Sequence, residues 1–157
     1  MAKLEGNKWM VENLDGKTDI VIEKDLELKH SVYIYNAKNS LVTIKGKCNS
    51  VVLDKCVKSG VIFDHAVAAL EIINCKGAKA QINKDVPSVT IDNTAGATIF
   101  FGGDSKNASV YTSKSTEVNL NVPKGDEGDY DEAPIPSQFV STYANGKWGT
   151  VAVEHVG

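Results

Sequence analysis

The chain has 157 residues, of which 42% are hydrophobic, and its formal net charge at pH 7 is −3. A slightly acidic chain of this length is expected to form one soluble domain spanning residues 1–157, and its charge disfavours nucleic-acid binding. No apolar run approaches the roughly 20 residues of a membrane-spanning helix, and the first residues are too polar for a secretory signal. We therefore expect a cytoplasmic protein without a membrane span.

Residues 1–30 contain short alternating segments instead of a regular repeat. In this region apolar and polar residues alternate within DIVIE and LELKH, which is typical of short strands. A repeated structure needs atypical elements at its ends to close the stack. We expect residues 1–30 to form a cap and the irregular first coils of the repeat that follows.

Residues 31–122 repeat with a period of nineteen residues. Each repeat contains two apolar-x-apolar pairs ten residues apart, which indicates two short strands and leaves no room for a crossover helix. The pattern predicts an all-β fold, a parallel β-helix with coils of about 19 residues, in which equivalent residues of successive coils stack as columns. The four predicted inward columns are Val32, Val51, Leu70, Val89 and Ala108; Ile34, Leu53, Ile72, Ile91 and Val110; Val42, Val61, Ala80, Ile99 and Val118; and Ile44, Phe63, Ile82, Phe101 and Leu120.

The three cysteines, Cys48, Cys56 and Cys75, are odd in number and lack C-x-x-C spacing. Neither a disulfide framework nor a zinc site is indicated, so we expect reduced structural thiols and no metal or cofactor. Cys56 and Cys75 lie nineteen residues apart and are expected to stack at one turn.

Residues 123–138 form an acidic segment rich in proline and glycine, without an apolar period. Prolines cannot donate a hydrogen bond to a β-ladder. We expect this segment to leave the stack as an extended connecting loop.

Residues 139–157 contain Asn145-Gly146 between two alternating runs, which is a strong signal for a β-hairpin with a type I′ turn. An isolated two-stranded hairpin is marginally stable in water, so it must pack on the coils or pair with another chain. The outermost strand also offers an open edge. We expect the hairpin to be exchanged in a homodimer, with a dimerisation surface made of Phe139, Val140, Tyr143, Trp148, Val151 and Val153.

An enzyme is one alternative, because polysaccharide lyases and hydrolases also use parallel β-helices with clustered acids and often calcium. Asp54, Glu71 and Asp92 fall on one predicted outer face. That face is flat, without long loops to build a cleft, and the three histidines lie in separate regions of the sequence. We therefore expect no catalytic residues.

All seventeen basic residues are lysines. A mechanism that needs a guanidinium, such as an arginine finger inserted into a GTPase, is therefore excluded. This disfavours a second alternative, a GTPase-activating module like those of tubulin-folding relatives of the β-helix. Five lysines fall in the turn after the first strand of each coil, where stacking forms a basic edge that fits an acidic protein partner or, equally, ordinary solvated turns: Lys38, Lys55, Lys58, Lys76 and Lys79.

The sequence also resembles the C-terminal domain of cyclase-associated protein, over nearly the whole chain from Trp9 to Gly157. The resemblance is carried by KWMVENLDGKTDIVIE, KGKCNSVVLDKC, GVIFDHAVAALEIINCK, NVPKGDEGDYDEAPIPSQF and NGKWGTVAVEHVG. It implies a right-handed parallel β-helix whose C-terminal hairpin is exchanged in a homodimer. It also implies a cytoskeleton-associated protein that binds monomeric actin, preferably loaded with ADP, and promotes nucleotide exchange or sequesters monomers.

Under this resemblance, the lysine edge, the outward positions beside it and the C-terminal tail are expected to contact actin. The chain starts directly at this domain; if it is complete and not one domain of a longer protein, it resembles the minimal versions of apicomplexan parasites, and weaker exchange with more prominent sequestration is expected. The expected actin-binding residues are Lys38, Lys45, Lys47, Asn49, Asp54, Lys55, Lys58, Asn74, Lys76, Lys79, Gln81, Glu154, His155, Val156 and Gly157.

Overall fold

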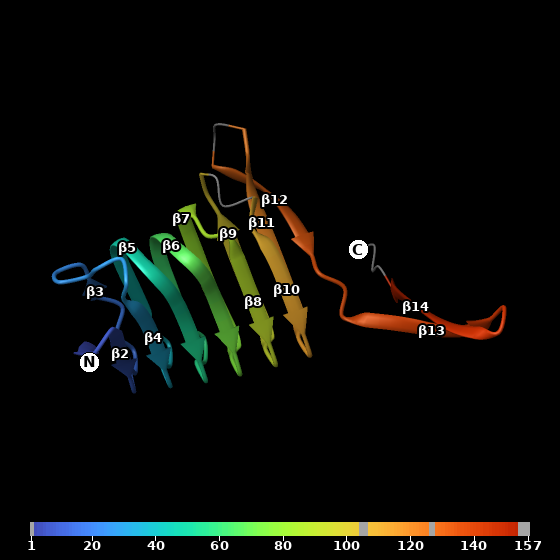
Figure 1. Cartoon of the computed structure of the whole chain (residues 1–157), viewed down its shortest axis with the longest axis horizontal. Helices are drawn as coiled ribbons and strands as arrows, with labels where there is room; N and C mark the ends of the chain where they lie inside the picture. The colour runs from blue at the N-terminus through green and yellow to red at the C-terminus, as the bar shows by residue number, and fades with distance from the viewer. Residues whose placement is uncertain (1, 104–106, 126–127, 154–157) are drawn as a thin grey trace.

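The computed structural model describes residues 2–103, 107–125 and 128–153, which form an all-β structure. Coils of parallel strands stack side by side, and a two-stranded hairpin projects beyond the last coil (Figure 1). The strands are β1 (Ala2–Glu5), β2 (Lys8–Glu12), β3 (Ile20–Ile22), β4 (Ser31–Tyr35), β5 (Leu41–Asp54), β6 (Gly60–Ile73), β7 (Lys76–Asp85), β8 (Ser88–Asp92), β9 (Ala95–Phe101), β10 (Ser109–Ser113), β11 (Thr116–Lys124), β12 (Asp129–Pro134), β13 (Gln138–Ala144) and β14 (Lys147–Val153).

Each coil contributes one strand to each of two facing sheets. The first sheet contains β2, β4, the C-terminal halves of β5 and β6, β8 and β10, all parallel. The second contains β3, the N-terminal halves of β5 and β6, β7, β9 and β11, also parallel. We call the connection from the first sheet to the second the first turn, and the return connection the second turn. The predicted β-helix is confirmed, with about six turns.

The core lies between the two sheets and consists of the predicted inward columns. In the first sheet Val51 pairs with Leu70 and Leu53 pairs with Ile72. These four side chains and Phe63 of the second sheet are fully buried. Each column therefore places an apolar side chain directly against its counterpart in the next coil, which a single coil could not achieve alone.

The last coil departs from the predicted register. Val110 pairs with Val89, and Leu120 pairs with Ile99. The predicted partners, Ala108 for Val89 and Val118 for Ile99, are wrong because this coil is two residues longer. The extra residues fall in the second turn between β9 and β10. A shift of two residues keeps every side chain on its original face, so the apolar pattern is preserved although the register changes.

The three cysteines are free and buried, as predicted. Cys56 and Cys75 lie in successive first turns, where the Cys56 thiol donates to the Ile34 carbonyl at 3.5 Å and the Cys75 thiol donates to the Ile73 carbonyl at 3.2 Å. Cys48 lies at the second turn, and burial raises the pKa of its thiol to about 11. These thiols are part of the core.

The N-terminal end of the stack is closed by β1, which pairs antiparallel with β2. The segment LELKH, residues 26–30, was expected to be strand-like but forms a turn that buries His30. The Trp9 indole N–H donates to His30 Nδ1 at 3.1 Å, and the Glu27 backbone N–H donates to the same atom at 3.0 Å. These bonds hold the turn against the first coil.

The C-terminal end is closed by β12, which pairs antiparallel with β11. The extended loop predicted for this acidic segment is therefore wrong over residues 129–134. Pro123 lies opposite Tyr130, and Pro134 pairs with Asn119 at the end of the ladder. Pro134 is tolerated because β12 is an edge strand, and Pro123 is tolerated because it lies beyond Asn121, the last residue of β11 that pairs with β9.

The predicted hairpin is formed by β13 and β14, which, among the described residues, pair only with each other. Asn145 and Gly146 have φ values of 54° and 78°, which agrees with the type I′ turn. The hairpin extends away from the coils (Figure 1).

Candidate functional site

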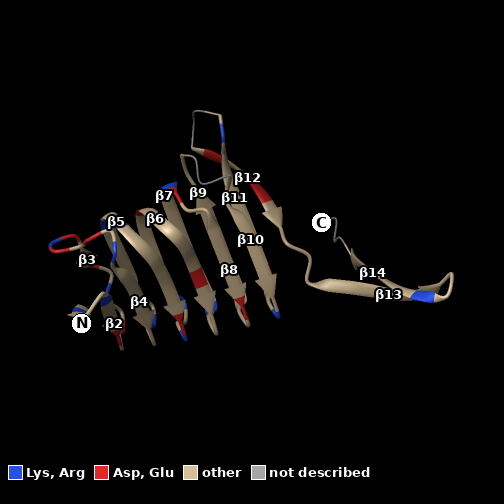
Figure 2. Ribbon diagram, in the orientation of Figure 1, with Lys and Arg blue, Asp and Glu red and all other residues tan. Residues whose placement is uncertain are grey.

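The lysines of the first turn stack along one edge of the β-helix. Lys38, Val57 and Lys76 are linked by parallel bridges between successive coils, and Lys79 pairs with Gly60 at the start of the second sheet. All five lysines predicted for this edge are exposed. Lysines and acidic residues gather where the strands of the first sheet end (Figure 2). We call Lys38, Lys55, Lys58, Lys76 and Lys79 the first-turn edge.

Three of the predicted contact residues lie elsewhere. Lys45, Lys47 and Asn49 belong to the second turn, so they do not adjoin the first-turn edge as expected. Lys47 pairs with His65, whose ring contacts the Asp85 carboxylate. The predicted set is therefore divided between two opposite edges of the stack, because the chain crosses the second sheet between them.

Two further predicted residues occupy the sheets. Gln81 is exposed on the outer face of the second sheet and donates from Nε2 to Asn83 Oδ1 at 3.0 Å. Asp54, on the first sheet, is only 8% exposed. Its carboxylate accepts hydrogen bonds from the Tyr33 hydroxyl and, at 3.4 Å, from Asn74 Nδ2. Asp54 therefore holds its neighbours in place and offers little surface to a partner.

The three acidic residues of the predicted outer face, Asp54, Glu71 and Asp92, have different surroundings. Asp54 is buried and hydrogen-bonded, Glu71 is exposed, and Ile73 lies between Asp54 and Asp92 in the sheet. Within the described residues, no group of three or more His, Cys, Asp and Glu side chains is arranged to hold a metal ion. The described part also contains no helix long and apolar enough to cross a membrane.

The Tyr33 hydroxyl gives a testable pH dependence. Its hydrogen bond to Asp54, aided by partial burial, raises the pKa of Tyr33 to about 12. The folded state therefore holds this proton more tightly than the unfolded state, so the contribution to stability is complete below pH 10 and is lost as the pH rises towards 12. We expect the urea midpoint of Tyr33→Phe to fall less between pH 9 and pH 11 than that of the unsubstituted protein. If the urea midpoints of the two proteins fell equally over this pH range, the stabilising role of the Tyr33–Asp54 hydrogen bond would be contradicted.

The first turn contains two positions with left-handed backbone, a conformation that asparagine and glycine adopt more easily than other residues. In the turn between β5 and β6, lysine occupies both positions, as Lys55 (φ 54°) and Lys58 (φ 48°). The first position holds Asn13, Asn36, Lys55, Asn74, Asn93 and Lys114, and the second holds Gly16, Asn39, Lys58, Gly77, Gly96 and Glu117.

The asparagines of the first position form a ladder that Lys55 interrupts. Asn36 Nδ2 donates to Asn13 Oδ1 at 2.7 Å, and Asn93 Nδ2 donates to Asn74 Oδ1 at 2.8 Å. Lys55 stands between Asn36 and Asn74 and places its ammonium 5.8 Å from the Tyr35 ring centre. Residues kept in unfavourable backbone conformations tend to cluster at functional sites. The turn containing Lys55 and Lys58 is therefore the strongest candidate on the first-turn edge.

Replacing Lys55 with asparagine is expected to stabilise the fold. A left-handed conformation costs roughly 1–2 kcal/mol for an ordinary residue and less for asparagine, so Lys55→Asn should raise the unfolding free energy by about 0.5–1 kcal/mol. The measurement is urea unfolding at 25 °C. Lys76→Asn is the matched control, because Lys76 is an exposed lysine of the same edge without a positive φ. A gain no larger than that of the control would contradict the strain at Lys55.

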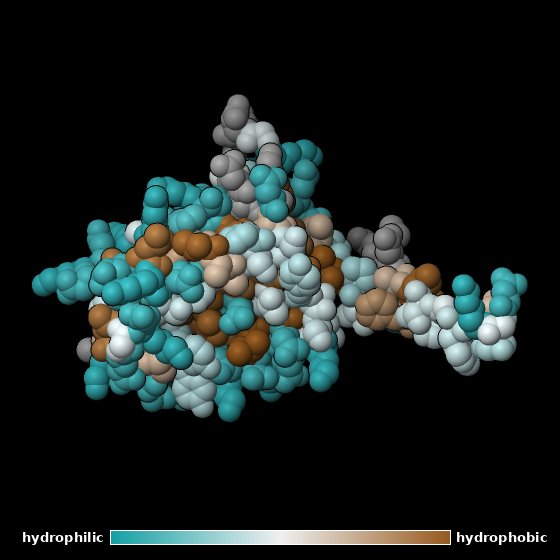
Figure 3. Space-filling model, in the orientation of Figure 1, coloured by the Kyte–Doolittle hydropathy of each residue, from teal (hydrophilic) through white to brown (hydrophobic). Residues whose placement is uncertain are grey.

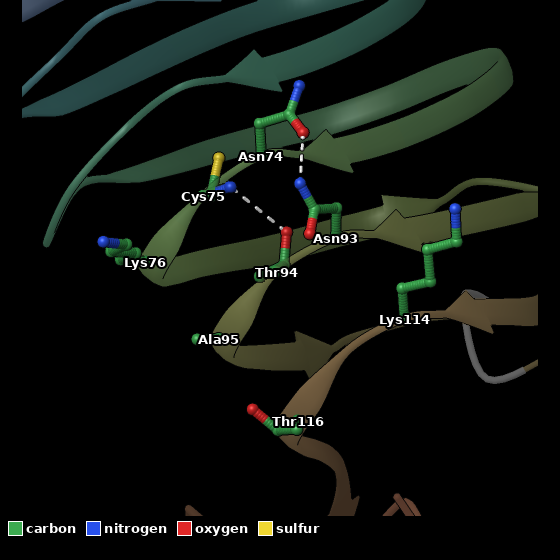
Figure 4. A pocket seen from close by; sticks show the side chains of 8 residues that line it. All are labelled: Asn74, Cys75, Lys76, Asn93, Thr94, Ala95, Lys114 and Thr116. Atoms are coloured by element: carbon green, nitrogen blue, oxygen red, sulfur yellow. Dashed lines mark hydrogen bonds between the residues drawn. The ribbon is translucent and has the colours of Figure 1, made fainter.

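A pocket of about 240 Å³ lies further along the same edge. Asn74, Asn93 and Thr94 line it, with Lys76 and Lys114 at its rim (Figure 4). The asparagine amides bond to each other, and the Cys75 N–H donates to Thr94 Oγ1 at 3.3 Å. Because these polar groups are already paired, this pocket presents mainly its two lysines.

The predicted dimerisation residues lie on the projecting hairpin. Phe139, Tyr143, Trp148 and Val151 are each more than 60% exposed, and Tyr143 packs edge-to-face on Trp148 at 5.4 Å. On the projecting hairpin, Figure 3 shows a small group of brown and tan residues between pale and teal ones. The remaining predicted contacts, Glu154, His155, Val156 and Gly157, lie outside the described residues.

Comparison with known proteins identifies relatives over almost the entire chain. Residues 1–155 match the family model described as "Adenylate cyclase associated (CAP) C terminal". Cyclase-associated protein 1 of Arabidopsis thaliana is 42% identical over 153 residues, which are 97% of this chain and 32% of that protein. Adenylyl cyclase-associated protein 1 of Homo sapiens is 39% identical over 157 residues, which are 100% of this chain and 33% of that protein. The chain thus spans about a third of the length of these relatives.

A solved structure agrees with the same assignment. The crystal structure of cyclase-associated protein from Cryptosporidium parvum superposes with a TM-score of 0.90 and 31% sequence identity, over 98% of this chain and 94% of that chain. Sequence and fold therefore lead to the same family: the chain belongs to the adenylyl cyclase-associated protein (CAP) C-terminal family.

Proposed function

We propose that this chain binds monomeric actin, preferably in the ADP form, and promotes nucleotide exchange or sequesters monomers. The observation that most supports this proposal is on the first-turn edge. There, the exposed Lys55 and Lys58 adopt left-handed backbone at positions that asparagine or glycine occupies in the two neighbouring coils. Membership of the CAP family supports actin as the class of partner. The expected setting is the cytoplasm, in association with the actin cytoskeleton.

The first-turn edge fits a protein partner because its lysines have a fixed spacing. Parallel stacking repeats equivalent positions at about 4.8 Å from coil to coil, so the charges are arranged on a rigid support. Such a surface steers an acidic partner and fixes its orientation, even where each pair contributes little affinity. Lys45, Lys47 and Asn49, at the opposite edge, are proposed as contacts only if a second actin surface reaches the second turn.

Promotion of exchange requires no bond chemistry by this chain. A ligand shifts a conformational equilibrium only by its difference in affinity for the two states. The proposed mechanism is therefore tighter binding to the actin state whose nucleotide cleft is more open. If affinity is instead higher for the closed state, the same contacts sequester monomers.

A homodimer is the second part of the proposal. The apolar side chains of the hairpin have no partner element within the described part of the chain besides the hairpin itself, and such a hairpin is marginal when isolated. Pairing with a second copy buries them. We also propose that residues 154–157, which lie outside the described residues, contact a second actin surface.

The test is the release of a fluorescent ATP analogue from monomeric actin. Faster release with the protein present supports exchange promotion, and slower release with binding supports sequestration. Unchanged release in the absence of any binding would contradict the proposal. Cleavage of polyuronate or stimulation of a GTPase without actin binding would instead favour the β-helix enzyme or the tubulin-cofactor-like module.

A further inference from the structure

A groove of about 540 Å³ lies where the first turns enter the second sheet. Thr18 lines it together with Leu41, Gly60 and Lys79, which are neighbours in successive strands of the second sheet, and with Lys58 and Gly77, which precede Gly60 and Lys79 by two residues. The groove thus crosses successive coils beside the first-turn edge. None of its lining residues is acidic.

The two glycines create the groove. Gly60 pairs with Leu41 on one coil and with Lys79 on the next, so the row of side chains is interrupted there. A Cβ added to Gly60 would lie 3.0 Å from the Lys79 carbonyl oxygen. Gly77 has a φ of +72°, and a Cβ there would lie 3.6 Å from Lys58 Cγ. A side chain at Gly60 would therefore crowd the Lys79 backbone, whereas one at Gly77 would fit beside Lys58 but be strained by the positive φ.

The polar character of the groove comes mainly from its two ammonium groups. The hydroxyls of Ser40 and Ser59 are already used, since they donate to the carbonyls of Lys38 and Val57 at 2.8 and 3.0 Å. The ion pairs found among the described residues do not include Lys58 or Lys79. The groove therefore combines two exposed cations with an apolar floor at Leu41 and Gly60.

We propose that this groove binds an acidic segment of the actin monomer, with carboxylates at Lys58 and Lys79 and an aliphatic side chain on Leu41 and Gly60. The proposal rests on the proposed function and names the surface that performs it. Charge complementarity identifies an acidic occupant, because the lining holds two cations and no anion. The apolar floor and the length of the groove across coils favour a peptide segment over a small inorganic anion.

The experiment compares two double variants that change the net charge equally. Lys58→Glu with Lys79→Glu alters the groove, whereas Lys24→Glu with Lys84→Glu alters two exposed lysines that belong neither to the groove nor to the expected actin-binding residues. We expect the groove variant to weaken ADP-actin binding tenfold or more and the control variant to change it about twofold or less. Thr18→Trp, which obstructs the groove without changing charge, should also weaken binding at an unchanged thermal midpoint. Equal affinities for all variants would overturn the proposal.

A second measurement separates the groove from the proposed function. A blocked peptide of sequence DELDE is titrated into the isotopically labelled protein, and the Gly60 and Gly77 amide signals are followed by NMR. Shifts at both glycines, lost in the Lys58→Glu, Lys79→Glu variant, support the groove even if actin does not bind. Actin binding without these shifts and with full affinity in the groove variant would overturn the groove and leave the function standing. Dissociation of dimers by the groove variant would instead assign the groove to the acidic strand β12 of a second copy, which also overturns the proposal.

Discussion

Phe63→Ala is expected to lower the unfolding free energy by about 3–5 kcal/mol, which is a large part of the 5–15 kcal/mol typical of a domain. Phe63 is fully buried and pairs with Ile44 on one side and Ile82 on the other. Truncation leaves a cavity that neither neighbouring coil can fill, because each residue of a column is fixed by its own strand. The measurement is urea unfolding at 25 °C.

Phe100→Ala is the matched control for this variant. Phe100 is half-buried on the outer face of the second sheet and packs edge-to-face on Tyr130 at 5.2 Å. Because it lies outside the core, its truncation should cost about 1–2 kcal/mol. If Phe100→Ala destabilised the protein as much as Phe63→Ala, the inward columns would not be the principal source of stability.

Deletion of residues 139–157 is expected to convert a dimer into a monomer while the coils remain folded. Within the described part of the chain, the hairpin contributes five large exposed apolar side chains and forms no ladder with the β-helix. Burying such a surface against a second copy is favourable by roughly 25 cal/mol for each Å² of apolar area. The deletion should therefore reduce the mass measured by light scattering from that of two chains to that of one. The coils of the resulting monomer should still unfold in a single thermal transition.

A point variant distinguishes loss of the hairpin from loss of its apolar face. Trp148→Ser with Val151→Asp retains the chain length but removes two of the exposed side chains. It should also give monomers at micromolar concentration. An unchanged mass for both variants would contradict dimerisation through the hairpin.

The sequence was sufficient to predict the architecture because the fold is periodic. Val51 and Leu70 were assigned to one column from their spacing alone, and their pairing is confirmed. The register of the last coil could not be predicted, since an insertion of two residues preserves the apolar alternation at Val110 and Leu120. The strand β12 was missed because its proline and acidic residues resemble a loop, although an edge strand tolerates both.

The candidate site was predicted only in part. The stacking of Lys38 and Lys76 follows from the period and is confirmed. The separation of Lys47 from them was missed, because apolar columns do not reveal which turn a polar residue occupies. The groove at Gly60 and Gly77 was also missed, although two glycines aligned near stacked lysines were a visible signal of an open position.

Direct titration of monomeric actin with the full chain tests the proposed function most simply. Calorimetry with ADP-actin and with ATP-actin, in the same buffer, gives both affinities and the stoichiometry. We predict binding to both forms, tighter to ADP-actin, and a weaker interaction for the Lys58→Glu, Lys79→Glu variant. If neither heat of binding nor complex formation were detected with ADP-actin or with ATP-actin, the proposed function would be contradicted.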